Sequence, residues 1–315
     1  MSVQTFALLG SLKHVEIMGH QQADSLEVFN LRWPAGDGLN YATLDEALEA
    51  HAIEVVESTE AGRVSRIKII NRSEQMVFLM AGEQLVGCKQ NRVLNASIMV
   101  PPHAEMPLPV TCVERGRWGY TSSAFSSART SSYYGLRAMM HGHTTKSYRF
   151  SGVPISDQGE VWGEVSRKLH SMSSPSSSDA MQDLYRTYDA RLKDLEEKIS
   201  FPAGCNGAVF VVDGRIVGSD LFDKADTLHK LWPKLIRSCS IDALERPTES
   251  SRSLTEEEVL RWLESTASAT QEPFPSPGMG LDVRIEGEDV IGASLVIEEH
   301  PVHMELFRPT LPQQP

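Results

Sequence analysis

Short apolar pieces alternate with polar positions along the first part of the chain, and this pattern predicts antiparallel β-structure. Such pieces cover residues 26–33, 52–58, 64–71, 75–82, 82–102 and 107–118. Gly, Asn, Pro or Asp stands between several of them, as is usual at turns. Because successive side chains of a strand point to opposite faces of a sheet, one face can be buried while the other meets water. We expect a β-rich N-terminal half.

Helical spacing begins only after the middle of the chain. Apolar residues three or four positions apart predict helices over 156–170, 176–199 and 223–239. Ser156 or Asp157 would cap the first helix, and Pro233 should kink or break the last one because proline has no backbone N–H. Thr255 and Glu258 form a capping-box sequence, which predicts the start of a further helix.

Strand patterns return in the last third of the chain. Segment 207–222 predicts a hairpin around Asp213 and Gly214, 269–280 is expected to be a loop, and 281–307 predicts a β-pair before a Pro/Gln tail. The fold class is therefore α+β, with C-terminal strands returning to a sheet begun early. We expect one domain over 1–312; the alternative is a β-rich lobe 1–155 and a mixed α/β lobe 156–312.

Composition and charge narrow the classes of function. The net charge of -12 argues against nucleic acid and anionic membranes as partners, because both need a positive field. The four cysteines are far apart in sequence and are expected to be reduced. No basic start precedes an apolar run, and no run approaches the ~20 residues that cross a bilayer. We expect a cytoplasmic protein. The sequence does not decide between a monomer and a homo-oligomer.

Residues 116–156 contain no Asp or Glu, although the chain has 42 acidic residues in 315. The same interval carries several cationic and aromatic side chains, namely Arg117, Arg129, Arg137, Lys146, Arg149, Trp118 and four tyrosines. Arginine binds phosphate through two hydrogen bonds and aromatic faces stack on bases, so this interval suits a phosphate-bearing ligand with a flat ring. Residues 119–150 show no clear periodicity and are expected to be an irregular segment. The alternative to a ligand site is a solvated basic loop, or one that docks on an acidic surface of the same protein.

The segment after residue 110 offers a pair of arginines. If residues 110–118 form a strand, Arg115 and Arg117 share one face, while Glu114 and Trp118 share the other. Two neighbouring guanidinium groups need an anion or a carboxylate between them. Glu83 could be that carboxylate in an ion-pair network, and this structural interpretation has as much support as a ligand site.

The predicted hairpin 82–102 carries polar side chains where a buried strand would have apolar ones. A bulge at Gly87 would bring Glu83 and Arg92 to the same side of the sheet, so the sequence does not assign these side chains to one face or the other. The candidate ligand-binding residues are Lys89, Gln90, Arg92, Arg115, Arg117 and Trp118, and the candidate catalytic bases are Glu83 and Glu114.

Metal binding has weaker support. His141 and His143, or His300 and His303, could each offer two imidazoles, but no Cys or closely spaced acid completes either set. We predict no metal site. Asp213 is explained by its turn, and Asp220 by a cap or loop contact.

Four stretches together resemble one known family: "AGEQLVGCKQNRVLNASIMVPP", "VTCVERGRW", "DQGEVW" and "CNGAVFVVDGRIVGSDLF". The family is named for its association with ADP-ribosylglycohydrolases and rhodanese-phosphatases, and the resemblance runs from about residue 60 to the C-terminal "HMELF". The positions that match are Glu83, Gly87, Lys89, Gln90, Arg92, Glu114, Arg117, Trp118, Gln158 and Trp162. The serine-rich stretch before residue 133 and "HGH" do not match.

The resemblance implies a theme of NAD-derived and phosphorylated compounds. Together with the cationic segment, it predicts a protein that binds an anionic ligand related to ADP-ribose or another ribose phosphate, with hydrolase and transferase left open as activities. The alternative is a non-catalytic scaffold or partner-binding protein, whose charged motif is an internal ion-pair network.

Overall fold

The protein is described here as a computed structural model covering residues 8–35, 39–59, 65–245 and 252–309. The first seven residues and most of the expected Pro/Gln tail lie outside these ranges. The fold is α+β, with antiparallel strands dominating the N-terminal half, helices following, and C-terminal strands returning to the main sheet, as the sequence predicts.

The largest sheet has eight antiparallel strands. Their spatial order is β1 (Glu16–Ala23), β2 (Leu26–Arg32), β12 (Gly207–Val212), β13 (Arg215–Phe222), β17 (His300–Phe307), β16 (Ile291–Ile297), β15 (Leu281–Glu286) and β14 (Thr270–Pro275). The hairpin turn between β12 and β13 is confirmed, since Asp213 and Gly214 both have positive φ, at 53° and 68°. The loop prediction for 269–280 is wrong in part, because β14 pairs with β15. Its prolines are tolerated at the sheet edge, where an N–H can be missing.

Two smaller sheets hold most of the N-terminal strands. One has the order β11 (Phe125–Ser131), β7 (Glu83–Gly87), β8 (Arg92–Leu94), β10 (Glu105–Cys112), β5 (Arg66–Asn71) and β4 (Ile53–Glu57). The other contains β3 (Tyr41–Thr43), β6 (Met76–Leu79) and β9 (Ile98–Val100), with β3 and β6 parallel. The predicted hairpin 82–102 is confirmed in its first part as the β7–β8 pair, whereas its last part forms β9, which pairs with β6 in the other sheet.

The helices are a 3-10 helix η1 (Leu9–His14) and α1 (Leu44–Glu49), α2 (Tyr134–Ser151), α3 (Gln158–Ser171), α4 (Gln182–Thr187), α5 (Asp189–Lys198), α6 (Ala225–Glu245) and α7 (Glu256–Thr266). Asp157 caps α3, with its carboxylate accepting from the Glu160 N–H at 2.9 Å, and the Thr255–Glu258 capping box is present. The predicted helix 176–199 divides into α4 and α5, and α6 continues through Pro233 without a break.

The expectation of an irregular segment over 119–150 is wrong, because β11 and α2 occupy most of it. Helix α2 buries polar residues such as Arg137, His141 and Thr144 beside apolar ones such as Leu136 and Met140. These buried polar groups break the apolar period, and without that period a helix cannot be recognised in the sequence.

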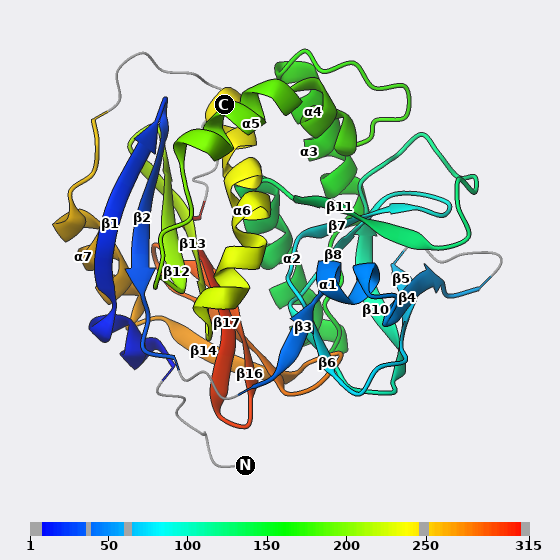
Figure 1. The fold of residues 1–315 in the computed structure, drawn as a ribbon, viewed down its shortest axis with the longest axis horizontal. Coiled ribbons are helices and arrows are strands. Elements are labelled where there is room, and N and C mark those ends of the chain that lie inside the picture. Colours follow the sequence, from blue (N-terminus) through cyan, green and yellow to red (C-terminus); the bar gives the residue numbers. More distant parts are fainter. Residues whose placement is uncertain (1–7, 36–38, 60–64, 246–251, 310–315) are drawn as a thin grey trace.

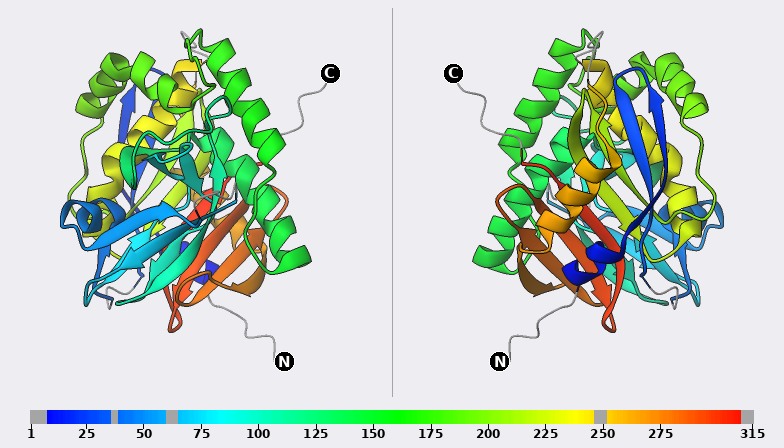
Figure 2. Two further views of the ribbon diagram at one scale, coloured as in Figure 1. Left: turned by 90° about the vertical axis from the view of Figure 1, so that its right-hand side faces the viewer. Right: turned by 90° about the vertical axis from the view of Figure 1, so that its left-hand side faces the viewer.

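The elements form layers, with α6 and α2 between the eight-stranded sheet and the sheet that contains β7 and β11 (Figures 1 and 2). One face of the large sheet packs against α6 through residues such as Phe210, Phe222 and Leu235. The opposite face packs against η1 and α7, with Leu9 and Trp262 among the buried contacts. Helix α2 therefore lies where buried charged side chains of both halves of the chain can meet.

Candidate functional site

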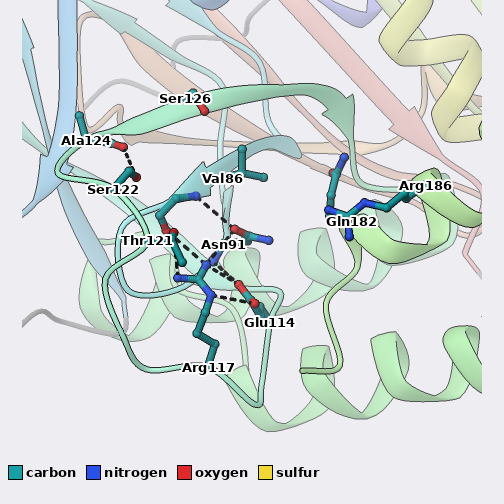
Figure 3. A pocket seen from close by; sticks show the side chains of 11 residues that line it. Val86, Asn91, Glu114, Arg117, Thr121, Ser122, Ala124, Ser126, Gln182 and Arg186 are labelled. Carbon is teal, nitrogen blue, oxygen red and sulfur yellow. Dashed lines mark hydrogen bonds and ion pairs between the residues drawn. The ribbon is translucent and has the colours of Figure 1, made fainter. Parts of the chain in front are cut away.

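A pocket of about 580 Å³ opens beside the turn between β7 and β8 (Figure 3). The segment after β10, the start of β11 and helix α4 form its other walls. Its lining residues are Val86, Gly87, Asn91, Glu114, Arg117, Thr121, Ser122, Ala124, Ser126, Gln182 and Arg186. Of the candidate catalytic and ligand-binding residues predicted from the sequence, Glu114 and Arg117 line this pocket.

Arg117 and Glu114 form a two-point ion pair in the pocket wall. The Arg117 Nε donates to Glu114 Oε1 at 2.8 Å, and Nη2 donates to Oε2 at 2.6 Å. The remaining guanidinium donors reach the Cys88 carbonyl at 2.7 Å and the Gly119 carbonyl at 2.9 Å. Arg117 therefore fastens the 117–121 segment to the β7–β8 turn, and its hydrogen bonds are made within the protein.

Glu114 is held as a carboxylate. Besides the guanidinium of Arg117, the Asn91 N–H donates to it at 3.1 Å and the Ser178 hydroxyl at 2.9 Å. Burial alone would raise the pKa of this carboxyl, but the hydrogen bonds from Arg117, Asn91 and Ser178 hold it below its usual range. A carboxylate stabilised in this way is a weak base, so its geometry suits support of the pocket wall.

The strand expected over 110–118 ends at Cys112, so the prediction that Arg115 and Arg117 share one face by alternation is wrong. Backbone hydrogen bonds from Val113 to Asn91 and from Gly116 to Ser178 turn the chain away from the sheet. Arg115 is exposed at this bend, whereas Arg117 is turned inward.

Glu83 lies apart from the lining of this pocket, in a closed ion-pair cluster. Its Oε1 accepts from the Lys234 ammonium of α6, and its Oε2 accepts from the Met80 N–H at 2.8 Å. Lys234 also binds Asp45 of α1 at 2.8 Å. Burial would lower the pKa of Lys234, but the charges of Glu83 and Asp45 raise it above its usual value. This cluster joins α6 to α1 and to β7 of the six-stranded sheet.

Lys89, Arg92 and Trp118 come together outside the pocket lining. The Lys89 Nζ lies 5.4 Å from the ring centre of Trp118 and 5.0 Å from that of Tyr120, and the Arg92 Cζ lies 5.6 Å from that of Trp118. Cations at these distances are attracted to the ring faces. Trp118 and Tyr120 are about half exposed, at 49% and 54%. The stack presents aromatic surface on the same segment that supplies Arg117.

Arg92 itself is fully buried. Its guanidinium lies 3.7 Å from Glu57 and contacts the Cys112 sulfur. Gln90 is also buried, and Gly87 and Cys88 have positive φ of 115° and 42° at the end of β7. Leu85 pairs with Arg92, which places Glu83 and Arg92 on the same side of their sheet.

A second cluster, which the sequence did not reveal as a group, lies where α2 meets β13, β15 and β17. Asp220 and Glu305 both accept hydrogen bonds from Arg137, and Glu305 also lies 3.0 Å from His141. Arg284 Nη2 lies 2.8 Å from His141 Nδ1. Because a guanidinium can only donate, this ring nitrogen is the acceptor. All five side chains are at least 95% buried.

The charges in this cluster support one another. Burial alone would raise the pKa values of both carboxyls, but Arg137 and the histidines lower that of Glu305 to about 2 and hold that of Asp220 well below its usual range. Burial lowers the pKa of His141, with Glu305 opposing this effect. The interpretation of Asp220 as a cap or loop contact is wrong, because it lies within β13. A charged residue inside an otherwise apolar strand, as in "GSDLF" and "HMELF", was the available signal.

Within the described ranges, no three His, Cys, Asp or Glu side chains are placed to hold a metal ion. His143 instead hydrogen-bonds to Ser156 at 3.0 Å and Glu160 at 2.9 Å. All four cysteines are buried and unbridged. None of the described helices is long and apolar enough to span a membrane.

The fold and site define a class of α+β protein in which charged side chains of sequence-distant strands meet around a central helix layer. The chain belongs to the family described as the ARG and Rhodanese-Phosphatase-superfamily-associated Protein domain, whose model matches residues 14–307. This confirms the resemblance found in the sequence, with ARG denoting ADP-ribosylglycohydrolase. No curated protein and no solved structure matches the chain.

Proposed function

We propose that the chain is a cytoplasmic protein that binds a small anionic ligand, nucleotide-derived or a ribose phosphate, in the pocket between the 117–126 segment and α4. The observation that carries the proposal is the pocket volume of about 580 Å³, which lies within the ~300–1,000 Å³ range of small-molecule sites. The family name supports the ADP-ribose theme. Four reduced cysteines support the cytoplasmic location.

Arg186 is the cationic group best placed to meet a phosphate. It lines the pocket from α4, its side chain is 76% exposed, and its partner is Asp183 at 2.9 Å. Because the guanidinium of this pair is solvent-exposed, the pair contributes only ~0–1 kcal/mol, so Arg186 can exchange Asp183 for a ligand phosphate at little cost. The Gln182 amide and the Ser126 hydroxyl would receive ribose hydroxyls.

The residues predicted from the sequence take supporting roles in this proposal. Arg117 and Glu114 hold the wall of the pocket through their ion pair, so they act on the ligand through the position of the loop. Trp118 would offer a face to a base, and Lys89 beside it would add positive charge. Glu83, Gln90 and Arg92 stabilise the sheets behind the loop.

The test is calorimetric titration of the wild type with ADP-ribose, AMP, ribose 5-phosphate and inorganic phosphate, repeated with Arg186→Gln. Loss of a charge-assisted hydrogen bond should weaken binding by about 1.5–3 kcal/mol, or tenfold or more. Arg191→Gln is the matched control, since Arg191 is exposed on α5 and pairs with Asp24 instead. Absence of binding to the wild type at millimolar ligand, or equal losses in both variants, would remove the pocket as the site.

A scaffold is the second candidate function. It is favoured by the closed pairing of Glu83 with Lys234 and of Arg117 with Glu114, both within the protein. In that case, Arg117→Ala would lower the unfolding temperature, and none of the four ligands would shift it for either protein.

A further inference from the structure

Three side chains in the interior form a hydrogen-bonded chain that ends in a hydroxyl. The Ser97 Oγ lies 2.9 Å from His303 Nδ1, and His303 Nε2 lies 3.1 Å from Asp220 Oδ1. Ser97 directly precedes β9, His303 lies in β17 and Asp220 in β13. A hydroxyl, an imidazole and a carboxylate linked in this order are the parts of an activated serine nucleophile.

The surrounding donors decide where the protons lie. Ser97 Oγ accepts a hydrogen bond from the Ala81 N–H at 3.0 Å, so its own proton is directed at His303 Nδ1. The His303 Nε2 then carries the other proton and donates it to Asp220. Asp220 stays ionised, because Arg137 donates to both of its oxygens, at 3.0 and 2.6 Å. In this tautomer, Nδ1 can take the serine proton.

The hydroxyl end of the chain adjoins a narrow gap in the packing. The gap is lined by Ser97, His303, Ala293, Leu295, Asp282 and Glu305. It is too narrow to hold a water molecule, so the proposed reaction requires a local opening that admits the reactant. Two apolar side chains suit a short acyl group, and two carboxylates disfavour an anion.

We propose that Ser97 is a nucleophile, with His303 as its general base and Asp220 as the positioning residue, in a second site that hydrolyses small neutral or cationic esters. The Ser97 Oγ bonds to the carbonyl carbon while its proton passes to His303 Nδ1. The bond from that carbon to the leaving oxygen breaks, and the leaving alcohol takes the proton. Water then attacks the acyl-serine, gives its proton to His303, and releases the acid as Ser97 Oγ is reprotonated.

This site shares no lining residue with the 580 Å³ pocket, so the inference goes beyond the proposed ligand binding and does not depend on it. Burying Asp220, Glu305, Arg137 and Arg284 together with His141 and His303 has a large desolvation penalty, which an apolar core of the same volume would avoid. Charged groups collected around a potential nucleophile are typical of functional sites.

The first experiment treats the folded wild type with methanesulfonyl fluoride, chosen for its size, and locates the adduct by intact mass and peptide mapping. A single methanesulfonyl group on Ser97 is the expected result. Ser97→Ala should abolish it, and His303→Gln should slow it by about 100-fold or more. Ser294→Ala is the matched control, since this buried hydroxyl donates to the His303 carbonyl at 2.8 Å and should leave labelling unchanged.

The second experiment follows release of p-nitrophenol from p-nitrophenyl acetate, with trapped acetyl-Ser97 sought in the same samples. Circular dichroism establishes that each variant is folded. The position of the adduct on the wild type can be interpreted even if a variant fails to fold. The proposal is overturned if no adduct forms on Ser97 of the wild type, if the label maps to other residues, or if Ser97→Ala and the wild type release p-nitrophenol equally fast.

Discussion

Arg137 of α2 holds Asp220 of β13 through two hydrogen bonds, from Nη1 to Oδ2 at 3.0 Å and from Nη2 to Oδ1 at 2.6 Å. Nη2 also reaches Glu305 of β17 at 2.7 Å, so one guanidinium joins two neighbouring strands to the helix above them. The Tyr134 hydroxyl donates to the same Asp220 carboxylate. This pairing both fixes α2 on the sheet and orients the carboxylate that faces His303.

Arg137→Met should destabilise the protein by about 3–5 kcal/mol, because it leaves Asp220 and Glu305 buried without their counter-charge. Urea unfolding followed by circular dichroism measures the change. Arg149→Met serves as the control, since Arg149 lies on the same helix in exposed pairs with Glu272 and Glu286 and should lose less than about 1 kcal/mol. Similar losses in the two variants would contradict the importance given to burial.

Acid should destabilise the protein through Glu305. Burial alone would raise the pKa of its carboxyl, but His141 and Arg137 lower it from 4.5 to about 2. Because the folded-state pKa lies below the unfolded one, this group adds stability that is present above about pH 4.5 and is lost as the pH falls towards 2. The loss is on the order of 3 kcal/mol.

Urea midpoints at pH 6, 5, 4, 3 and 2 would measure this effect. Glu305→Gln should be less stable at pH 6 and should show a shallower decline through the acid range, since its amide does not titrate. Glu105→Gln, at an exposed partner of Lys68, is the control and should follow the wild type. An identical decline in Glu305→Gln would show that other groups cause the acid sensitivity.

Lys234 and Glu83 should behave as a coupled pair. Lys234→Met alone leaves the Glu83 carboxylate buried and should cost about 3–5 kcal/mol, whereas adding Glu83→Gln removes the stranded charge and restores part of the loss. A double-mutant cycle by urea unfolding measures the coupling, expected above about 1 kcal/mol. The exposed pair of Lys198 and Asp194 gives the comparison, with expected coupling below about 0.5 kcal/mol. Additive losses at Lys234 and Glu83 would refute the pairing.

Arg117→Lys keeps the positive charge of Arg117 and should still destabilise the protein by about 1–2 kcal/mol. A lysine ammonium cannot bind both Glu114 oxygens and two carbonyls in the plane that the guanidinium provides. Thermal unfolding measures this loss, and proteolysis between residues 117 and 124 should become faster. Arg115→Lys at the neighbouring exposed position should change neither quantity.

The sequence by itself determined the features that depend on neighbours along the chain. The α+β class, the β7–β8 hairpin, the Asp213–Gly214 turn and the caps of α3 and α7 follow from period, turn chemistry and capping residues, all of which act over a few positions. The family was also visible in local motifs. The sequence did not reveal the edge strand β14, with its prolines, or the split between α4 and α5.

Only the tertiary structure decided which charged residues meet. Ser97, Asp220 and His303 are 83 or more positions apart in the chain. They meet because β13 pairs with β17 and because Ser97, just before β9, lies within hydrogen-bond distance of His303. Helix α2 escaped prediction for the same reason, since its polar side chains are satisfied by partners on other strands. A buried charge is stable only beside its partner, and sequence spacing does not contain the distance between two strands that the fold brings together.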